Sequence, residues 1–542
     1  MTAARVECLH QVLLWPLRLL RSGAAVHSRR PWEWLQAQAD SPWRELLDEY
    51  TGDPEKFHER HYQEFLTFLP YVQRVLFGEG RSPHQADDCL GESGMKTFRR
   101  HDVAAFEVVT QPGRAPLRLQ VVHIDLIFFY DIDTVLLNVE LRGENLALPE
   151  VQELLYRLGR AYPAGWDGQG LPLHCLAESR FLAADGRVLV ESDTREREPF
   201  IQHVQARRAP RIAAHWAWLL RPLVPDHGEA AGPLRYRQVE YYRMPVMAYL
   251  ALDDPLKLSR ADFVRLGLVC GAGDGQLPYG EAHLQEFEAR HCWDRFWCAQ
   301  GAAPHTRYIS CGHALVVLGS ARHEFFTHRE RGVLAQFRHQ HFLLFLLVHF
   351  QKAALLMYSD RLVDALRRLN VGDPENVRIF KREIRSCFEG FLRFTHRYWF
   401  LDVSEQVQAR TLHRMLLQHL DVQPLYAEVK RRIEDMAQYL ETDNVRRQAS
   451  TVVRLTVVTI FGLVGTITTG FLGMNLLAEA EAPLWQRLLV FGGTLVATLW
   501  LTAYTIIKSK RLSDFLDALS DERLGLLDKA RAFGGVWRRG AD

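Results

Sequence analysis

Two long apolar stretches stand out near the end of the chain. Leu455–Met474 and Leu488–Ile507 each extend for twenty residues without a charged side chain. Twenty helical residues, at a rise of about 1.5 Å each, cover the hydrocarbon core of a bilayer, which is about 30 Å thick. Because only a short linker separates the two stretches, the pattern predicts a pair of membrane-spanning helices.

The N-terminal part shows another pattern, in which strand-like and helix-like periods alternate. This alternation predicts an α/β or α+β domain over residues 1–330. Pro149–Tyr162 has helical spacing, and Val12–Leu20, which Pro16 interrupts, is expected to be an edge strand or a short amphipathic segment rather than a secretory signal. The expected strands are Phe106–Thr110, Leu117–Phe129, Thr134–Leu141, Phe263–Cys270, Tyr308–Leu318 and the arms of a hairpin around Asp185–Gly186.

Helical spacing dominates from about residue 331, so residues 331–450 are predicted to form an all-α bundle. The apolar run between His341 and His349 is too short to span a bilayer and predicts a buried helix. The expected helices are Phe337–Leu369, Glu375–Leu401, Ser404–Leu420 and a long stalk helix that begins after Pro424 and continues into the first apolar stretch.

Basic residues flank the apolar pair on its outer sides. Three arginines lie between residues 446 and 454 and three basic residues lie between 508 and 511, whereas Leu476–Gln486 contains none. Cytoplasmic flanks are enriched in Lys and Arg, so both termini are expected in the cytoplasm of a multi-pass protein of an inner or plasma membrane. The predicted segments are 1–330 (cytoplasmic domain), 331–450 (bundle and stalk), 451–475 (first span), 476–487 (extracytoplasmic loop), 488–507 (second span) and 508–542 (cytoplasmic basic and amphipathic tail).

Composition narrows the possible functions. The net charge is +1, from 66 basic and 65 acidic residues, which gives no electrostatic case for a nucleic-acid partner. The eight cysteines include no CxxC pair, as expected for reduced cytosolic thiols. No GxSxG or HExxH motif is present, and Gly271–Gly275 lacks the spacing of a nucleotide-binding loop. We therefore expect neither an enzyme nor a bound cofactor.

Two further groups of polar residues are weak candidates for metal ligands. The acidic pairs Asp131/Asp133 and Asp253/Asp254 are expected to be ordinary loop carboxylates. The second group fits no standard zinc spacing, and it comprises His291, Cys292, Cys298, His305 and Cys311.

The first apolar stretch carries a stripe of small and hydroxylated residues. They recur mostly at steps of three and four, which places them on one side of a helix. Close helix packing through small residues is one interpretation, and a pore wall whose hydroxyls face water is the other. The second stretch is plainer and suits an outer, lipid-facing ring. The residues of the stripe are Thr456, Thr459, Gly462, Thr466, Thr469, Gly470 and Gly473.

The sequence Gly473-Met474-Asn475 lies at the outer end of the first span. This tripeptide, within the order of α/β domain, helical bundle, stalk helix, span, short loop, span and basic end, resembles the CorA-type magnesium channel superfamily. The similarity is at the level of residues around the two spans and at the level of domain order upstream. It implies a funnel-shaped homopentamer in which five copies of the first span line a pore for divalent cations.

The resemblance also implies roles for individual residues. Gly473, Met474 and Asn475 would form the selectivity filter, in which a ring of Asn475 amides holds the ion through its own waters. Such a ring suits Mg²⁺, which dehydrates reluctantly and prefers octahedral oxygen ligands. Glu479 and Glu481 would form a cation-attracting ring, or are simply solvated loop acids. The implied pore-lining residues are Gly470, Thr466, Leu463, Leu455 and Val452, of which the last three form an apolar constriction.

Some residues depart from the family pattern. Leu472 stands where an aromatic residue usually precedes the motif, and Leu476–Glu479 replaces the usual acidic, proline-containing loop. Influx of Mg²⁺ driven by the membrane potential is the expected function. The alternatives are a Zn²⁺, Co²⁺ or Ni²⁺ transporter of the same fold and a non-conducting, membrane-anchored scaffold or sensor. In the tail, a stripe that includes Leu512 and Leu519 is expected to lie on the membrane surface or against the stalk.

Overall fold

The computed structural model divides the chain into two compact units, Met1–Ile433 and Glu434–Asp542. Each unit is considered by itself. The residues that the structure describes are 4–21, 30–37, 41–46, 59–78, 93–232, 234–240, 243–273, 276–367, 369, 374–478, 483–486, 488–490, 492–494, 496–498, 500 and 504.

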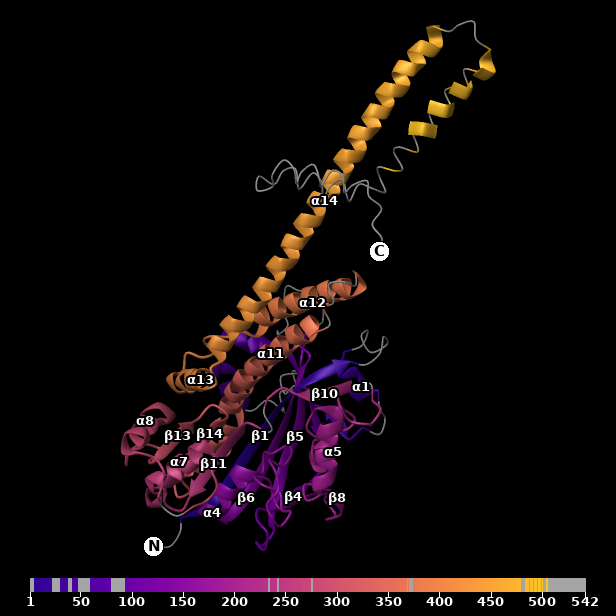
Figure 1. The fold of residues 1–542 in the computed structure, drawn as a ribbon. Helices are drawn as coiled ribbons and strands as arrows, with labels where there is room; N and C mark the ends of the chain where they lie inside the picture. Colours follow the sequence, from indigo (N-terminus) through magenta and orange to yellow (C-terminus); the bar gives the residue numbers. More distant parts are fainter. Residues whose placement is uncertain are drawn as a thin grey trace. The chain divides into compact units, whose positions relative to one another are not determined.

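The first unit is built on one 14-stranded sheet (Figure 1), which is mainly antiparallel. Its main path runs in the order β12-β13-β14-β11-β1-β6-β5-β4-β7-β8, with β10, β9, β3 and β2 attached beside it. The strands are β1 (Arg5–Arg21), β2 (Trp43–Glu45), β3 (Met95–Arg100), β4 (Ala105–Val109), β5 (Leu117–Phe129), β6 (Thr134–Ala147), β7 (Glu178–Leu182), β8 (Val188–Glu191), β9 (Val224–Pro225), β10 (Leu234–Gln238), β11 (Val246–Leu252), β12 (Cys292–Phe296), β13 (Thr306–Ser310) and β14 (Ala314–Ser320).

Short helices connect the strands, and longer helices follow them, so the fold is a sheet-rich N-terminal part followed by helices. This confirms the mixed α and β class. The helices are α1 (Glu33–Gln36), α2 (Glu59–Thr67), α3 (Pro70–Phe77), α4 (Leu148–Arg157), α5 (Arg197–Arg207), α6 (Ala214–Leu219), α7 (Arg260–Leu268), α8 (Glu281–His291), α9 (Glu324–Thr327), α10 (Val333–Gln336), α11 (Phe342–Arg367), α12 (Pro374–Tyr398), α13 (Val407–His419) and α14 (Val422–Ala478), with a 3₁₀ turn η2 (Pro255–Lys257) and a π-helical turn η3 (Phe337–His341).

Strand β1 lies inside the sheet, so the prediction of an edge strand or a short amphipathic segment was wrong. It pairs with β6 on one side, and on the other side with β11 up to Leu13 and with β10 from Leu17. The amide of Leu14 points to the β11 side, where it donates to Pro245 O at 3.0 Å. Alternation puts the nitrogen of Pro16 on the same side, in the gap between the two partner strands. The missing proline N–H therefore costs no ladder hydrogen bond.

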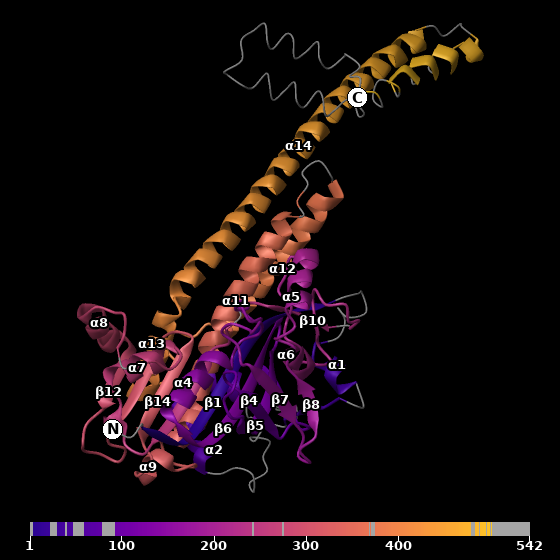
Figure 2. The same ribbon diagram turned by 60° about the horizontal axis from the view of Figure 1, so that its bottom comes forward.

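The two faces of the sheet are covered by different helices. Leu13 and Trp15 of β1 belong to the main hydrophobic core, which includes Val151 of α4 and Trp216 of α6. The opposite face packs on α11, where Phe129 of β5 stacks on Phe350 with ring centroids 3.5 Å apart. In Figure 2, α11 and α12 run side by side. The first unit is thus a sheet between two layers of helices.

Helix α11 shows why a helix buried inside a folded unit can look like a membrane span. With the preceding turns it forms Val333–Arg367, the only helix, among the residues that the structure describes, that is long and apolar enough to cross a membrane. An 18-residue stretch of this helix has a mean hydropathy of 1.6, but 78% of that stretch is buried inside the protein. One side of α11 contacts β1 and β6 and other sides contact α12 and α13. A helix with protein on several sides is apolar around most of its circumference, which confirms the prediction of a buried helix.

Several other predictions can be compared with the fold. Strand β5 has the predicted bounds, and the hairpin of β7 and β8 turns at Gly186, whose φ is +84°. Two predictions were wrong. Phe263–Cys270 lies mostly in helix α7, which begins with a capping box at Ser259, and Tyr308–Leu318 is not one strand but parts of β13 and β14, which turn at Gly312 with a φ of +71°.

Candidate functional site

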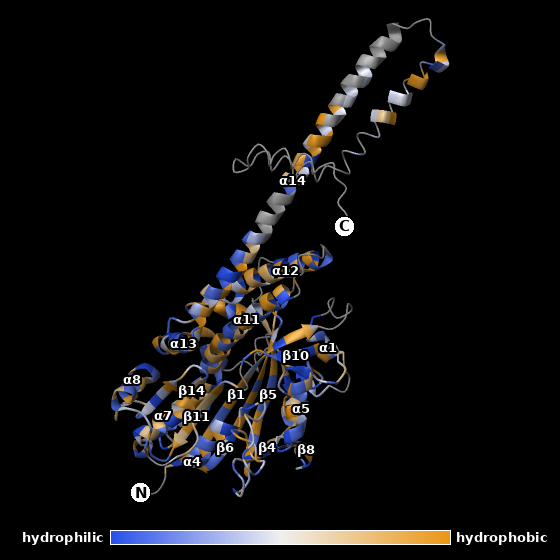
Figure 3. Cartoon of the chain, in the orientation of Figure 1, coloured by the Kyte–Doolittle hydropathy of each residue, from blue (hydrophilic) through white to orange (hydrophobic). Residues whose placement is uncertain are grey.

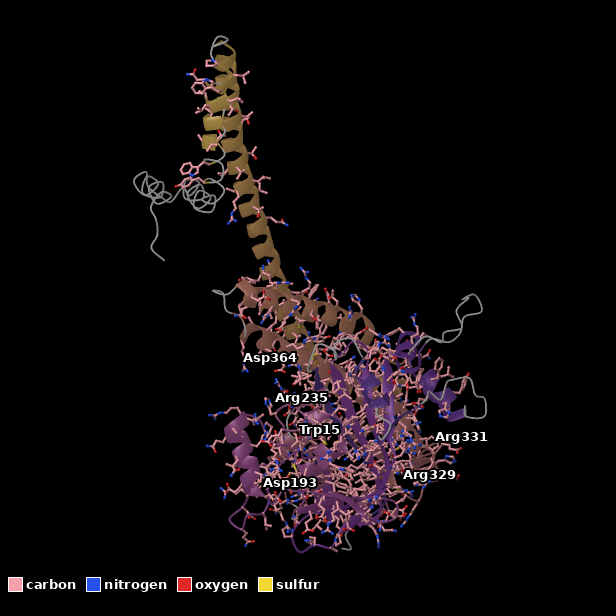
Figure 4. All side chains as sticks on the ribbon, turned by 90° about the vertical axis from the view of Figure 1, so that its right-hand side faces the viewer. Trp15, Asp193, Arg235, Arg329, Arg331 and Asp364 are labelled. Carbon is pink, nitrogen blue, oxygen red and sulfur yellow. The ribbon has the colours of Figure 1, made fainter. Side chains whose placement is uncertain are left out.

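The candidate site is the part of α14 from Val452 onward, in the second unit. Figure 3 shows the change along this helix: hydrophilic colours are frequent near its start, and hydrophobic and near-neutral colours follow further along it. The structure describes the backbone of α14 as helical up to Ala478. It also describes parts of the following segment between residues 483 and 504.

The five residues implied to line a pore lie on one side of α14. They are separated by three, eight, three and four residues, and at about 100° per residue they fall within an arc of about 80°. All five are exposed within the chain, and the three apolar ones strongly so. The residues are Val452 (61% exposed), Leu455 (66%), Leu463 (60%), Thr466 and Gly470. A contiguous face with large apolar side chains is thus left uncovered.

The side of α14 that carries Gly465 packs on the second apolar segment. A Cβ atom added at Gly465 would lie 2.6 Å from Thr498 Cγ2, well inside van der Waals contact, whereas Gly462 and Gly470 meet nothing within 4 Å. The small residues therefore have different surroundings. Close helix packing occurs at Gly465, which is not one of the predicted stripe residues. The signal was present, because Gly465 stands three residues after Gly462 and four before Thr469.

The threonine hydroxyls of α14 are oriented by their own helix. Thr456, Thr459 and Thr466 each donate to the carbonyl oxygen four residues earlier, at 2.8 to 2.9 Å. A hydroxyl whose hydrogen is used in this way keeps its oxygen lone pairs. By helical spacing, all three positions lie on or beside the exposed face. That face therefore offers oxygen acceptors between its leucines.

The motif residues lie further along the same helix. Gly473, Met474 and Asn475 have helical backbone within α14, but their side chains lie outside the described residues, as do Glu479 and Glu481. Asn475 stands five positions after Gly470, which corresponds to a rotation of about 500° along a regular helix. A helix that continued regularly would place position 475 about 140° away from the exposed face and position 474 close to it. A ring of Asn475 side chains around a pore thus requires the helix to open near Gly473, where glycine permits it.

The acidic pairs of the first unit have protein partners. Asp253 lies 2.6 Å from Lys257, and Asp254 caps η2 by accepting from the amide of Leu256. Asp131 and Asp133 lie within 4 Å of arginines on α12 and α11. This agrees with their interpretation as ordinary loop carboxylates.

The histidine and cysteine group is also held by local contacts. His291 Nδ1 lies 2.7 Å from Ser310 O, and burial raises the pKa of both Cys292 and Cys311 to about 12. Thiols with such pKa values are poor metal ligands at neutral pH. Among the described residues, no three His, Cys, Asp or Glu side chains are arranged to hold a metal ion.

The glycine-rich loop that begins at Gly271 is not open to a phosphate where it is described. Glu153 of α4 accepts a hydrogen bond from the amide of Ala272 at 2.9 Å, and a Cβ at Gly271 would lie 2.6 Å from the same carboxylate. A carboxylate therefore occupies the amide that a phosphate would need. Residues 274–275 lie outside the described part.

No protein-family model matches the chain, and neither a curated protein nor a solved structure matches it.

Proposed function

We propose that the chain is one subunit of a CorA-like channel that carries divalent cations, with Mg²⁺ as the expected ion. In this proposal the first apolar stretch lines a central pore, the second lies outside it, and five copies assemble around the axis. The observation that carries the proposal is the exposed face of α14 from Val452 to Gly470. This face combines large exposed leucines with threonines whose hydroxyls donate to the carbonyl oxygen four residues earlier. It lies away from the contact with the second segment.

Assembly around a pore accounts for both properties of this face. In lipid alone, the threonine oxygens would have no partner beyond their own helix. In an aqueous pore they accept hydrogen bonds from the waters around a hydrated ion, which keeps its first shell. Leu455 and Leu463 would form narrow apolar rings that stop conduction when water leaves them.

The proposed driving force and orientation follow from charge. The basic flanks favour an orientation with both termini in the cytoplasm. The membrane potential favours inward movement by about 2.3 kcal/mol per charge per 100 mV, and by about twice that for a dication. Glu479 and Glu481 would raise the local cation concentration at the outer mouth.

Flux into proteoliposomes tests the proposal. The full-length chain is reconstituted around a Mg²⁺-sensitive dye, and a valinomycin potassium potential, negative inside, is applied. We expect uptake that the potential accelerates and that Asn475→Ala greatly reduces, while the matched exposed variant Val496→Ala in the second segment leaves it unchanged. No uptake of Mg²⁺, Zn²⁺, Co²⁺ or Ni²⁺ by the intact protein would contradict the channel and favour the scaffold or sensor. Uptake of a transition metal but not of Mg²⁺ would identify the transition metal as the transported ion.

A further inference from the structure

Cys8 lies on strand β1 beside a buried group of charged residues. The pairing of β1 with β11 changes register between Val6 and Cys8. Bulges of this kind redirect the side chains next to them. Cys8 and His10 are two residues apart on the same strand, so their side chains project from the same face of the sheet. Cys8 is partly exposed, whereas His10 is only 4% exposed.

His10 is held by the carboxylate of Glu140. His10 Nδ1 lies 2.9 Å from Glu140 Oε1, and both side chains are buried. Arg338, from the helical layer, contacts the same carboxylate at 2.6 Å, and His123 Nε2 lies 3.3 Å from its other oxygen. Glu140 therefore fixes the imidazole of His10 and balances the positive charge around it.

Arg142 supplies a second cation near Cys8. It lies opposite His10 in the β1–β6 register, and its neighbour Glu144 lies opposite Cys8. Arg142 Nη2 contacts Glu144 at 2.5 Å, but its buried Nε has no hydrogen-bond partner among the described residues. On the β11 side, Tyr249 stands edge-on to His10 and its hydroxyl donates to Phe326 O at 2.7 Å. A negative charge on Cys8 would thus lie near the guanidinium of Arg142, whose Nε–H has no acceptor among the described residues.

The pKa values agree with this geometry. Burial raises the pKa of Cys8, but His10 and Arg142 outweigh it, so the pKa is lowered overall. Burial also acts on four other described cysteines, where it outweighs nearby cations such as Arg157 and Arg160 at Cys175 and Arg18 and Arg361 at Cys387. It raises the pKa to about 12 in Cys175, Cys292 and Cys311 and to about 11 in Cys387.

We propose that Cys8, His10, Glu140 and Arg142 form a reactive-thiolate site at which Cys8 is reversibly oxidised. In such a site the thiolate is the nucleophile, the imidazole faces it, and a third group orients the imidazole. The site is separate from the proposed pore and does not depend on it.

The chemistry needs a peroxide and a low-molecular-weight thiol. The Cys8 thiolate attacks one oxygen of hydrogen peroxide, the O–O bond breaks, and hydroxide leaves and takes a proton to become water. Cys8 is then a sulfenic acid, oxidised by two electrons. The thiol of glutathione attacks this sulfur, forms a mixed disulfide and releases a second water. Excess thiol restores Cys8 by disulfide exchange.

Alkylation kinetics test the site without any assumption about the oxidant. The full-length protein in detergent is treated with iodoacetamide between pH 5.5 and 9, and each cysteine peptide is quantified by mass spectrometry. Cys298, which is exposed, is the internal reference. Each unit of lowered pKa raises the thiolate fraction about tenfold and lowers its nucleophilicity about threefold, a net gain of about threefold below both pKa values. We expect Cys8 to react faster than Cys298 at pH 6.5, by about threefold for each unit by which the pKa of Cys8 is lowered, despite its lower exposure.

Variants distinguish activation of the Cys8 thiol by its neighbours from simple exposure of Cys8 to the reagent. Arg142→Gln is expected to shift the pH dependence of Cys8 alkylation to higher pH, and Arg142→Lys to return it most of the way toward that of the parent chain. The matched variant Arg180→Gln, on β7 of the same sheet, is expected to leave the pH dependence unchanged. Near-UV circular dichroism checks that each variant is folded. Hydrogen peroxide followed by glutathione should add glutathione to Cys8 first. A pH profile of Cys8 that matches Cys298, or that Arg142→Gln does not move in a folded protein, would overturn the proposal.

Discussion

Gly465 of α14 lies against Thr498 of the following segment so closely that a Cβ atom on the glycine would come within 2.6 Å of the threonine methyl. This contact fixes which side of α14 packs within the chain and leaves the side of Leu455 and Leu463 exposed. The close contact and the exposed face are therefore two consequences of one arrangement.

The contact predicts an interaction between the two positions. Gly465→Ala should destabilise the helical pair by about 1–3 kcal/mol, because it overpacks the contact. Thr498→Ser removes the methyl group, so the double variant Gly465→Ala/Thr498→Ser should regain most of the loss. Thermal unfolding of the purified protein in detergent measures each effect. Gly462→Ala and Gly470→Ala, where a Cβ meets nothing within 4 Å, are the controls. Purely additive effects of the two substitutions would contradict direct packing.

The hydroxyl of Thr466 is predicted to contribute to conduction. Thr466→Val keeps the shape but removes the oxygen, so potential-driven uptake should fall several-fold, whereas Thr466→Ser should retain it. Thr494→Val is a matched control, because Thr494 makes the same hydrogen bond, to Val490 O at 2.8 Å, on the second segment. Equal losses for Thr466→Val and Thr494→Val would indicate a role of both hydroxyls in helix packing instead.

The position of Asn475 can be tested with thiols. The proposed amide ring requires the helix to open near Gly473, so Cd²⁺ added outside should block uptake by Asn475→Cys, where five thiolates would meet. A helix that stays regular to Ala478 would instead place position 474 on the face of Gly470, and Met474→Cys would be the blocked variant. Inhibition of uptake by micromolar Cd²⁺, relative to the parent chain, distinguishes the two arrangements.

The buried carboxylate of Glu140 predicts a pH dependence of stability. Burial raises its pKa, but His10, His123 and Arg338 outweigh it, and the pKa falls from 4.5 to about 2. Because the folded pKa is the lower one, the stabilisation is complete above about pH 4.5 and is lost as the pH falls toward 2. The contribution is on the order of 3 kcal/mol. Urea unfolding followed by tryptophan fluorescence should show Glu140→Gln less stable than the parent at pH 7, with a smaller difference at pH 3. A difference that is independent of pH would contradict this linkage.

Much of the first unit could be predicted from local patterns. Strand β5 is dense in Val, Ile, Leu and Phe and has the predicted bounds, and Asp185-Gly186 marks a turn that needs a positive φ. The errors arose where tertiary contacts decide. Pro16 suggested an edge strand, but the gap between β10 and β11 removes the need for its missing N–H. Phe263–Cys270 reads as a strand by composition, yet the cap at Ser259 and packing on the sheet make most of it a helix.

By itself, the sequence determined the two apolar stretches, the mixed α and β class, the buried nature of the helix that contains the run between His341 and His349, and the positions that share one side of α14. These depend on composition and on the period of 3.6 or two residues, which neighbouring residues along the chain already carry. Only the tertiary structure decided that β1 is an interior strand, that Gly465 rather than Gly462 is the packing glycine, and that Arg142 lies near Cys8 while Glu140 holds His10. Such relationships join residues far apart in sequence, and they depend on register and on which side of an element its neighbour covers.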